Sequence, residues 1–182
     1  ENMRSVLISG KTMVLREITE ADLKALSAIL GDTATMDPYG SDPLTTEQIR
    51  QYIADARQAS AKKPRERYIL AAESLASAEV IGVSTLELGP YRSAMVGGLV
   101  RRDLWRAGNA SEGITLTIDF GFRELALHRI WGCHDSTNPA SGHVMAKVGM
   151  TYEGTRRESA LVRGQWIDSS TYSVLEHEWT AR

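Results

Sequence analysis

A run of small residues between an apolar segment and the start of a helix constrains this chain most. Leu99-Val100 leads into Trp105-Arg106-Ala107-Gly108-Asn109-Ala110, and a helix is expected to follow from Ser111-Glu112-Gly113. The first turn of a helix leaves backbone N–H groups unpaired and adds partial positive charge, so this junction can bind an anion, most often a phosphate. Gly108 and Ala110 lack the bulk that would keep a phosphate away from the backbone.

The composition of this loop leaves two interpretations open. Its spacing matches neither the Walker P-loop nor the dinucleotide pattern Gly-x-Gly-x-x-Gly, so an ordinary turn before an ordinary helix is the alternative. Asn109 and Glu112 stand three residues apart and predict a capping box. The residues from Ile114 to Leu125 fit both the alternation of a strand and the spacing of a helix, and the capped start favours the helix.

Several motifs in order along the chain resemble those of one superfamily. The loop at residues 105–110 resembles the acetyl-CoA loop of the GNAT N-acetyltransferases, Gln/Arg/Trp-x-x-Gly-x-Gly/Ala. The other motifs resemble the branch of ribosomal-protein N-terminal (alanine/serine) acetyltransferases; they are Leu15–Asp22, Leu127-His128-Arg129-Ile130, Asn138-Pro139-Ala140-Ser141 with Val144–Met150, and Glu153-Gly154-x-x-Arg157 with Gly164-x-Trp166-x-Asp168-x-x-x-Tyr172. This resemblance covers nearly the whole chain. It implies the GNAT fold of the α/β (α+β) class, in which a twisted, mixed, mostly antiparallel sheet of about seven strands is flanked by four helices.

The resemblance also implies an activity. Members transfer an acetyl group from acetyl-CoA directly to a primary amine, either a protein N-terminus or a small molecule, and release CoA. The loop would hold the pyrophosphate, and the pantetheine arm would pair with the strand before it, which splays from its neighbour. The residues implied for cofactor binding are Leu99, Val100, Arg101, Arg106, Ala107, Gly108, Asn109, Ala110, Ser111, Asn138 and Ser141. An acetyl-CoA-binding sensor or scaffold with little catalysis is the alternative.

Two polar residues at the start of a second helix are expected near the reacting sulfur. In the branch that the chain resembles, the Asn contacts the pantetheine arm and the Ser is the proton donor, roles that fall on Asn138 and Ser141. Many other members use a tyrosine a few residues later, but Met145 stands four residues after Ser141. From the residues alone, Asn138 is a helix cap before Pro139, and Ser141 is a polar residue of the first turn.

The general base is less clearly marked. The glutamate that serves in the ribosomal branch aligns with Ala160, while Glu158 stands two residues earlier. Because a shift of two residues keeps the same strand face, Glu158 is the predicted base. A salt bridge between Glu158 and Arg156 or Arg163 is the alternative role, and Asp168 is a second candidate for the base.

Periodicity and turn residues place the remaining elements. We expect strands over Met13–Ile18, Tyr68–Glu73, Val80–Leu88, Ser93–Val100, Arg129–Cys133, Thr151–Arg157 and Thr171–Trp179, and helices that begin at Thr19, Thr45 and Asn138. Gly97-Gly98 suggests a bulge or a close approach of two backbones. Gly31–Pro43 is predicted to be a loop, in which the candidate acceptor contacts are Asp32, Asp37, Tyr39 and Asp42; a plain surface role is the alternative.

Composition limits the other classes of function. The 182 residues suit a single domain over 1–182, and the 42% of hydrophobic residues are enough for a core. A net charge of -2 without a basic face argues against nucleic acid as a partner. The four histidines lack metal-site spacing, and Cys133 is the one cysteine, so we expect no metal and no internal disulfide. The chain has no membrane-spanning apolar run and no signal-peptide pattern, and we expect a cytoplasmic monomer or homodimer that does not bind membranes.

Overall fold

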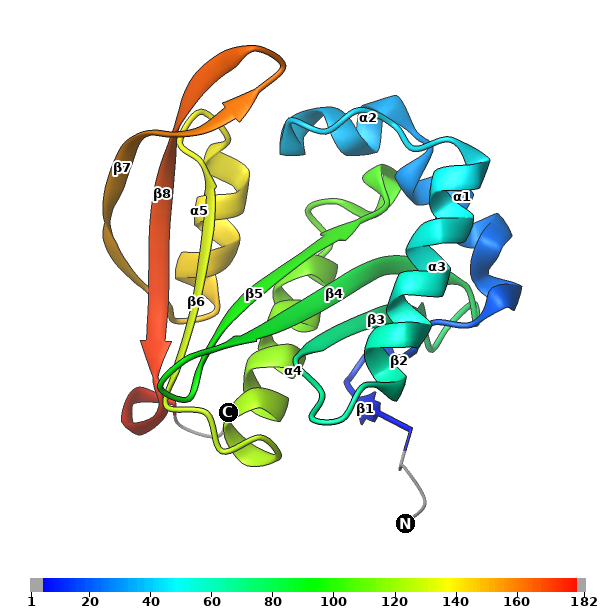
Figure 1. Ribbon diagram of the computed structural model, residues 1–182, viewed down its shortest axis with the longest axis horizontal. Helices are drawn as coiled ribbons and strands as arrows, with labels where there is room; N and C mark the ends of the chain where they lie inside the picture. The colour runs from blue at the N-terminus through cyan, green and yellow to red at the C-terminus, as the bar shows by residue number, and fades with distance from the viewer. Residues whose placement is uncertain (1–4, 180–182) are drawn as a thin grey trace.

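A single mixed sheet organises the computed structural model, which describes residues 5–179 (Figure 1). Its eight strands lie in the order β1-β2-β3-β4-β5-β6-β8-β7. Their bounds are β1 Leu7–Ser9, β2 Met13–Glu17, β3 Arg67–Ser74, β4 Val80–Gly89, β5 Ser93–Val100, β6 Arg129–Asp135, β7 Thr151–Val162 and β8 Gln165–Leu175. All neighbouring strands are antiparallel except β5 and β6.

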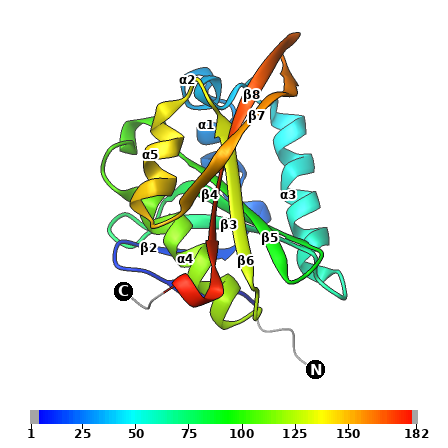
Figure 2. The ribbon, with the colours of Figure 1, turned by 90° about the vertical axis from the view of Figure 1, so that its left-hand side faces the viewer.

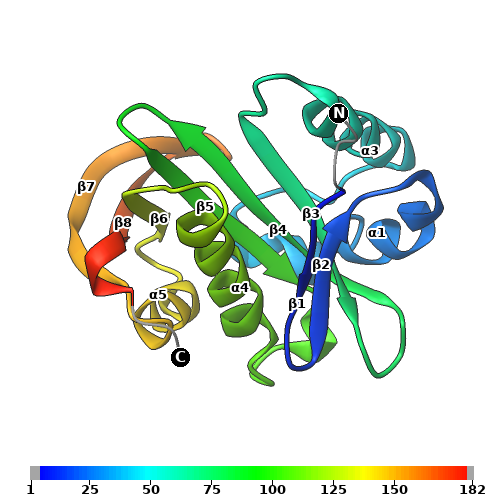
Figure 3. The ribbon, with the colours of Figure 1, turned by 90° about the horizontal axis from the view of Figure 1, so that it is seen from below.

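Helices cover both faces of this sheet. They are α1 Leu23–Leu30, α2 Thr33–Met36, α3 Thr46–Ala61, α4 Asn109–Arg123 and α5 Pro139–Lys147, with 3-10 turns η1 Glu20–Asp22, η2 Asp37–Tyr39, η3 Arg102–Leu104 and η4 Glu176–Glu178. Seen from below, α4 and α5 lie on one face, and α1 and α3 lie on the other (Figure 3). In residues 5–179 no helix is both long and apolar enough to cross a membrane.

The two buried clusters follow the alternation of the central strand. On β3, Tyr68, Leu70 and Ala72 join the cluster beneath α4, while Ile69 and Ala71 join the cluster beneath α1 and α3. Because successive side chains of a strand point to opposite faces, a strand covered on both faces is apolar without interruption. Burial of both sets fixes the register of β3, and with it the position of the neighbouring strands.

The sheet opens between its two parallel strands. Only Ser93–Met95 of β5 pair with Arg129–Trp131 of β6, and beyond these residues the strands diverge. Figure 1 shows β6, β7, β8 and α5 on one side of this opening and β1–β5 with the other helices on the opposite side. In a strand, half of the backbone groups point to each side, so the end of β5 has N–H and C=O groups that face the opening.

The predicted fold class is confirmed, with small differences in the elements. The sheet has eight strands instead of about seven, because β1 adds an edge strand, and there are five α-helices instead of four. The predicted loop over Gly31–Pro43 contains α2 and η2, since the Asp32 side chain accepts hydrogen bonds from the Thr35 N–H and hydroxyl and starts a helix.

The last hairpin differs from its prediction. β7 and β8 continue to a two-residue turn at Arg163-Gly164, so the other residues between the predicted strand ends, Arg157 and Thr171, belong to the strands. The chain after Leu175 turns into η4 and does not continue as a strand.

The expectation for Gly97-Gly98 is resolved in favour of close backbone approach. The β4–β5 pairing runs without a shift in register, so there is no bulge. A Cβ on Gly98 would lie 2.7 Å from the Val83 carbonyl oxygen.

Candidate active site

An elongated apolar cavity fills the opening between β5 and β6. Its volume is about 340 Å³. Its walls come from the ends of β5 and β6, the first turns of α4, one face of α5, and η2. The residues that line it include Val96, Gly97, Gly98, Leu99, Val100, Asn109, Ala110, Ile114, His134, Ser141 and Met145. We call this space the first cavity; it joins the start of α4 to the start of α5.

The loop at one end of the first cavity has unpaired backbone donors. In the part of the chain that the structure describes, the N–H groups of residues 106–111 donate no hydrogen bond. Gly108 has a φ of +87° and no atom within 4 Å of the place of a Cβ. The indole N–H of Trp105 donates to the Val100 carbonyl at 2.7 Å, and this bond holds the loop against the end of β5. Unpaired N–H groups at the start of a helix are what an anion site requires.

Glu112 fastens the same helix start to the turn between β1 and β2. Its carboxylate accepts hydrogen bonds from the N–H groups of Lys11 at 2.6 Å and Thr12 at 2.8 Å, and from the Thr12 hydroxyl at 2.6 Å. Partial burial opposes ionisation of Glu112, but hydrogen bonds from Thr12 and Lys11 outweigh it and lower the pKa. The predicted capping box is wrong, because the Asn109 amide donates to the Leu104 carbonyl instead.

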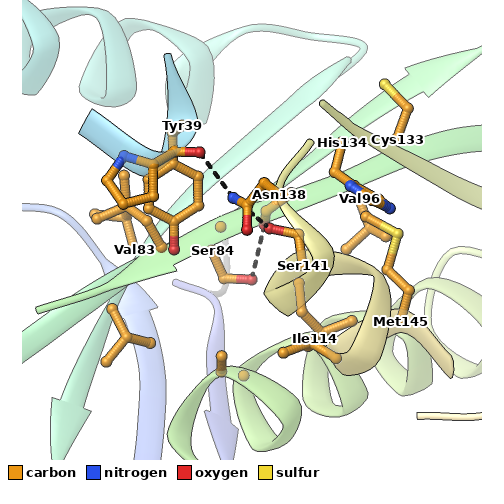
Figure 4. A pocket seen from close by; sticks show the side chains of 18 of the residues that line it. Tyr39, Val83, Ser84, Val96, Ile114, Cys133, His134, Asn138, Ser141 and Met145 are labelled. Atoms are coloured by element: carbon orange, nitrogen blue, oxygen red, sulfur yellow. Dashed lines mark hydrogen bonds between the residues drawn. The ribbon is translucent and has the colours of Figure 1, made fainter. Parts of the chain in front are cut away.

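Asn138 and Ser141 lie together at the other end of the first cavity (Figure 4). Asn138 precedes α5 but makes no side-chain cap. Its Nδ2 donates to the Pro38 carbonyl at 2.7 Å and lies 3.3 Å from Oγ of Ser141. Because the Asn amide donates in that contact, the Ser141 hydroxyl can still donate, and within residues 5–179 it has no acceptor.

A second cavity of about 750 Å³ begins where the first one ends. Pro38, Asp135, Asn138 and Ile167 line both spaces. The other residues around the second cavity come from the η2 segment, the connection between β6 and α5, and the β7–β8 hairpin; they include Asp37, Gly40, Glu158, Val162, Arg163, Trp166 and Asp168. The carboxylates that line the cavity outnumber the one guanidinium, and such a surface suits a cationic group.

Glu158 lies in an irregular part of β7. Arg156 pairs with Ser169 and Ala160 with Ile167, so β7 contains two extra residues, and Glu158 has a φ of +47°. The strand-face argument that selected Glu158 therefore does not apply here. Asp168 accepts the Glu158 N–H at 2.8 Å and holds this bulge. In residues 5–179 the Glu158 carboxylate forms none of the ion pairs that were considered for it.

The structure brings most of the predicted cofactor residues to the first cavity. Leu99, Val100, Asn109, Ala110, Asn138 and Ser141 line it, and Arg106, Ala107, Gly108 and Ser111 form the loop at its end. The Arg101 side chain points elsewhere, since its guanidinium pairs with Asp103 at 2.7 Å and lies 3.6 Å from Glu79.

The four residues predicted to contact the acceptor lie in different places. Tyr39 lines the first cavity and Asp37 the second, while Asp42 pairs with Arg163 and Asp32 caps α2. Tyr39 is 38% exposed, and desolvation raises its pKa, which keeps its hydroxyl protonated at neutral pH.

Sequence reasoning missed residues that only the topology brings together. The Pro38 carbonyl accepts a hydrogen bond from Asn138, which lies 100 residues later in the chain. No local sequence pattern predicts this contact. Arg163 was considered only as a partner of Glu158, yet it contacts η2. The one available signal was Gly164, since a glycine is common where a tight hairpin turn needs a positive φ, here +77°.

The sheet opens at its one parallel pair, with the unpaired N–H groups before α4 at one end of the opening and the polar side chains of Asn138 and Ser141 at the other. A family model described as an acetyltransferase (GNAT) domain matches residues 12–151, and the chain belongs to this GNAT acetyltransferase family. The enzyme class predicted from the motifs, an N-acetyltransferase, is confirmed.

Relatives support this assignment over the full chain. The uncharacterized N-acetyltransferase YoaA of Bacillus subtilis is 29% identical over 173 residues, which cover 93% of this chain and 97% of YoaA. The [ribosomal protein uS5]-alanine N-acetyltransferase of Escherichia coli is 28% identical over 105 residues, 56% of this chain and 54% of that protein. RimJ of Mycobacterium smegmatis, solved in complex with CoA-disulfide, has a TM-score of 0.80 at 22% identity and covers 96% of this chain and 86% of that one. The resemblance to the ribosomal branch is thereby confirmed.

Proposed function

We propose that this protein transfers an acetyl group from acetyl-CoA directly to a primary amine, a protein N-terminus or a small molecule, in the cytoplasm. The observation that carries the proposal is the junction of two chemically different cavities. The first is apolar and ends at a loop of free N–H groups, and the second is lined by carboxylates. They meet at Asn138, where a donor and an acceptor bound in the two spaces would touch.

The residues around the first cavity fit CoA. Among residues 5–179, the six consecutive N–H groups from Arg106 to Ser111 donate no hydrogen bond, and the space around the missing Cβ of Gly108 is open, features that suit a pyrophosphate. The guanidinium of Arg106 adds a positive charge beside them. The open edge of β5 offers backbone groups to the amides of the pantetheine arm, as in strand addition. Bound acetyl-CoA would supply the thioester whose carbonyl carbon accepts the amine.

Side chains of this protein would donate and accept the protons that the reaction moves. Ser141 would protonate the leaving thiolate, and the Asn138 amide, which donates to the Ser141 oxygen, supports this role. Glu158 lines the second cavity and is the proposed base that accepts the proton of the incoming ammonium, through water where the gap is too long. The backbone N–H groups at the end of β5 would polarise the carbonyl.

The decisive experiment is the release of free thiol from acetyl-CoA in the presence of the protein and a panel of amines and N-terminal peptides. Release with one class of acceptor supports the transferase and identifies its substrate. Tight binding of acetyl-CoA by calorimetry without release with any acceptor would contradict catalysis and leave a sensor or scaffold. Absence of both would contradict the proposed use of the first cavity.

A further inference from the structure

The tip of the β7–β8 hairpin contacts the η2 segment across the opening of the sheet. Nη1 of Arg163 donates to Asp37 at 2.7 Å, Nε donates to Asp42 at 3.1 Å, and Nη2 donates to the Ser41 carbonyl at 3.2 Å. One guanidinium therefore binds three oxygens of a segment that is more than 120 residues earlier in the chain. Figures 1 and 2 both show the hairpin tip at the end of the molecule where α2 lies.

Close packing supports this ionic contact. Gly40 has a φ of +67°, and a Cβ built on it would lie 2.8 Å from Cγ1 of Val162. The two backbones approach each other at this point because position 40 has no side chain. We call the contact between Asp37, Gly40 and Asp42 on one side and Val162 and Arg163 on the other the hairpin latch.

The hairpin latch is part of the wall of the second cavity. Asp37, Gly40, Val162 and Arg163 all line that cavity. The neighbouring Pro38 lines both cavities, and its carbonyl accepts a hydrogen bond from the amide of Asn138, which precedes α5. An acceptor amine that reaches Ser141 through the second cavity must therefore fit between the hairpin latch and the Asn138 amide.

We propose that Arg163 determines acceptor selectivity: the hairpin latch, when closed, admits small primary amines and restricts access by a polypeptide N-terminus. This inference rests on the proposed function. The side chains that hold the latch are exposed, Arg163 to 44%, Asp37 to 60% and Asp42 to 81%, so their attraction is weak and is screened by salt. Such a contact opens and closes readily, as acceptor exchange requires.

The first test opens the latch in two ways that change the charge in opposite directions. Arg163→Ala removes a positive charge, and Asp37→Asn with Asp42→Asn removes two negative charges. For both variants we expect kcat/KM for an alanine-led octapeptide, relative to alaninamide, to rise about fivefold over the wild type. Arg57→Ala, which removes the Arg57–Glu20 surface ion pair, is the matched control and should leave this ratio unchanged.

Two results of this test would overturn the proposal. Shifts in opposite directions for the two variants would mean that cavity charge and not the closed contact sets the ratio. An unchanged ratio in both would mean that the contact does not restrict acceptors.

The second test locks the latch. The Cβ position of Gly40 lies 3.8 Å from Cβ of Val162, the separation found in disulfides. Oxidation of the variant Gly40→Cys/Val162→Cys should form a bond that mass spectrometry detects and should lower the octapeptide-to-alaninamide ratio about tenfold, with recovery in dithiothreitol. Gly40→Cys alone controls for backbone strain.

The cross-link also separates this inference from the proposed function. Failure of the disulfide to form in the folded variant would show that the contact is absent, whatever the activity. A disulfide that forms without a change in the ratio would overturn the selectivity role. If the wild type releases no thiol with any amine, the proposed function is contradicted. Formation of the disulfide would still show that the contact exists.

Discussion

At the scale of single residues, Ser141 is the proposed proton donor. Its oxygen accepts a hydrogen bond from the Asn138 amide at 3.3 Å and lines the first cavity, and its hydroxyl donates to no residue among 5–179. Ser141→Ala should lower kcat about 100-fold, because general acid catalysis contributes at least this much. CoA affinity measured by calorimetry should stay within about twofold, because the cofactor loop is untouched. Ser60→Ala on α3 is the control, and wild-type turnover in Ser141→Ala would remove this residue from the mechanism.

The roles of Glu158 and Asp168 can be distinguished, because we expect one substitution to lower activity and the other to lower stability. The Glu158 carboxylate faces the second cavity without an ion partner among residues 5–179, whereas Asp168 accepts the Glu158 N–H and holds the bulge. Glu158→Gln should reduce kcat/KM about 100-fold without lowering the melting temperature. Asp168→Asn should destabilise the hairpin by about 1 kcal/mol, since it weakens one charged hydrogen bond. Thiol release and thermal unfolding measure the two effects, and the reverse pattern would make Asp168 the base.

At the scale of elements, the start of α4 depends on a contact that is remote in sequence. Glu112 accepts three hydrogen bonds from the β1–β2 turn, which hold the cofactor loop in place. Glu112→Gln should lower the free energy of unfolding by about 1 kcal/mol at pH 7, because charged hydrogen bonds become neutral ones, and should weaken CoA binding. Glu47→Gln, in the first turn of α3, controls for the helix dipole.

The same carboxylate gives a pH dependence with a definite sign. The pKa of Glu112 is lowered from its ordinary value of 4.5, so its contribution to stability is complete above that value and is lost as the pH falls through the folded-state pKa. The difference in unfolding free energy between the wild type and Glu112→Gln should therefore shrink below about pH 4.5. Urea unfolding across this range measures it. A difference that grows on acidification would contradict the assigned role.

Local chemistry predicted most elements, and long-range contacts explain the errors. The helix predicted to begin at Thr45 does so, and its capping box with Gln48 forms because both partners lie in one exposed turn. The Asn109–Glu112 box is absent because Glu112 is bound by Thr12, about a hundred residues away. The loop at residues 105–110 is one continuous segment, so the sequence could predict it. The second cavity could not be predicted, because its walls come from segments that only the sheet order brings together.

At the scale of the whole molecule, the two sides of the opening share one buried cluster, which joins Ile130 and Val174 to Ile118, but little backbone pairing. β5 and β6 share only three residue pairs, and the hairpin latch adds exposed contacts at the other end. A ligand in the first cavity would touch both sides, since β5 and α4 line one side and β6 and α5 the other. CoA should thus act as a structural link as well as a substrate.

Binding of CoA is therefore expected to raise the melting temperature. A ligand at about 100 times its dissociation constant adds about 2.7 kcal/mol, which is about 5–10 °C for a chain of this size.

Gly108→Ala and Gly154→Ala form a matched pair, because both positions have positive φ, +87° and +136°, and open space around the missing Cβ. Each should cost about 1–3 kcal/mol in backbone strain. Only Gly108→Ala should also lose most of the CoA-induced shift in thermal unfolding, because only its Cβ enters the phosphate loop; equal shifts in both variants would contradict pyrophosphate binding there.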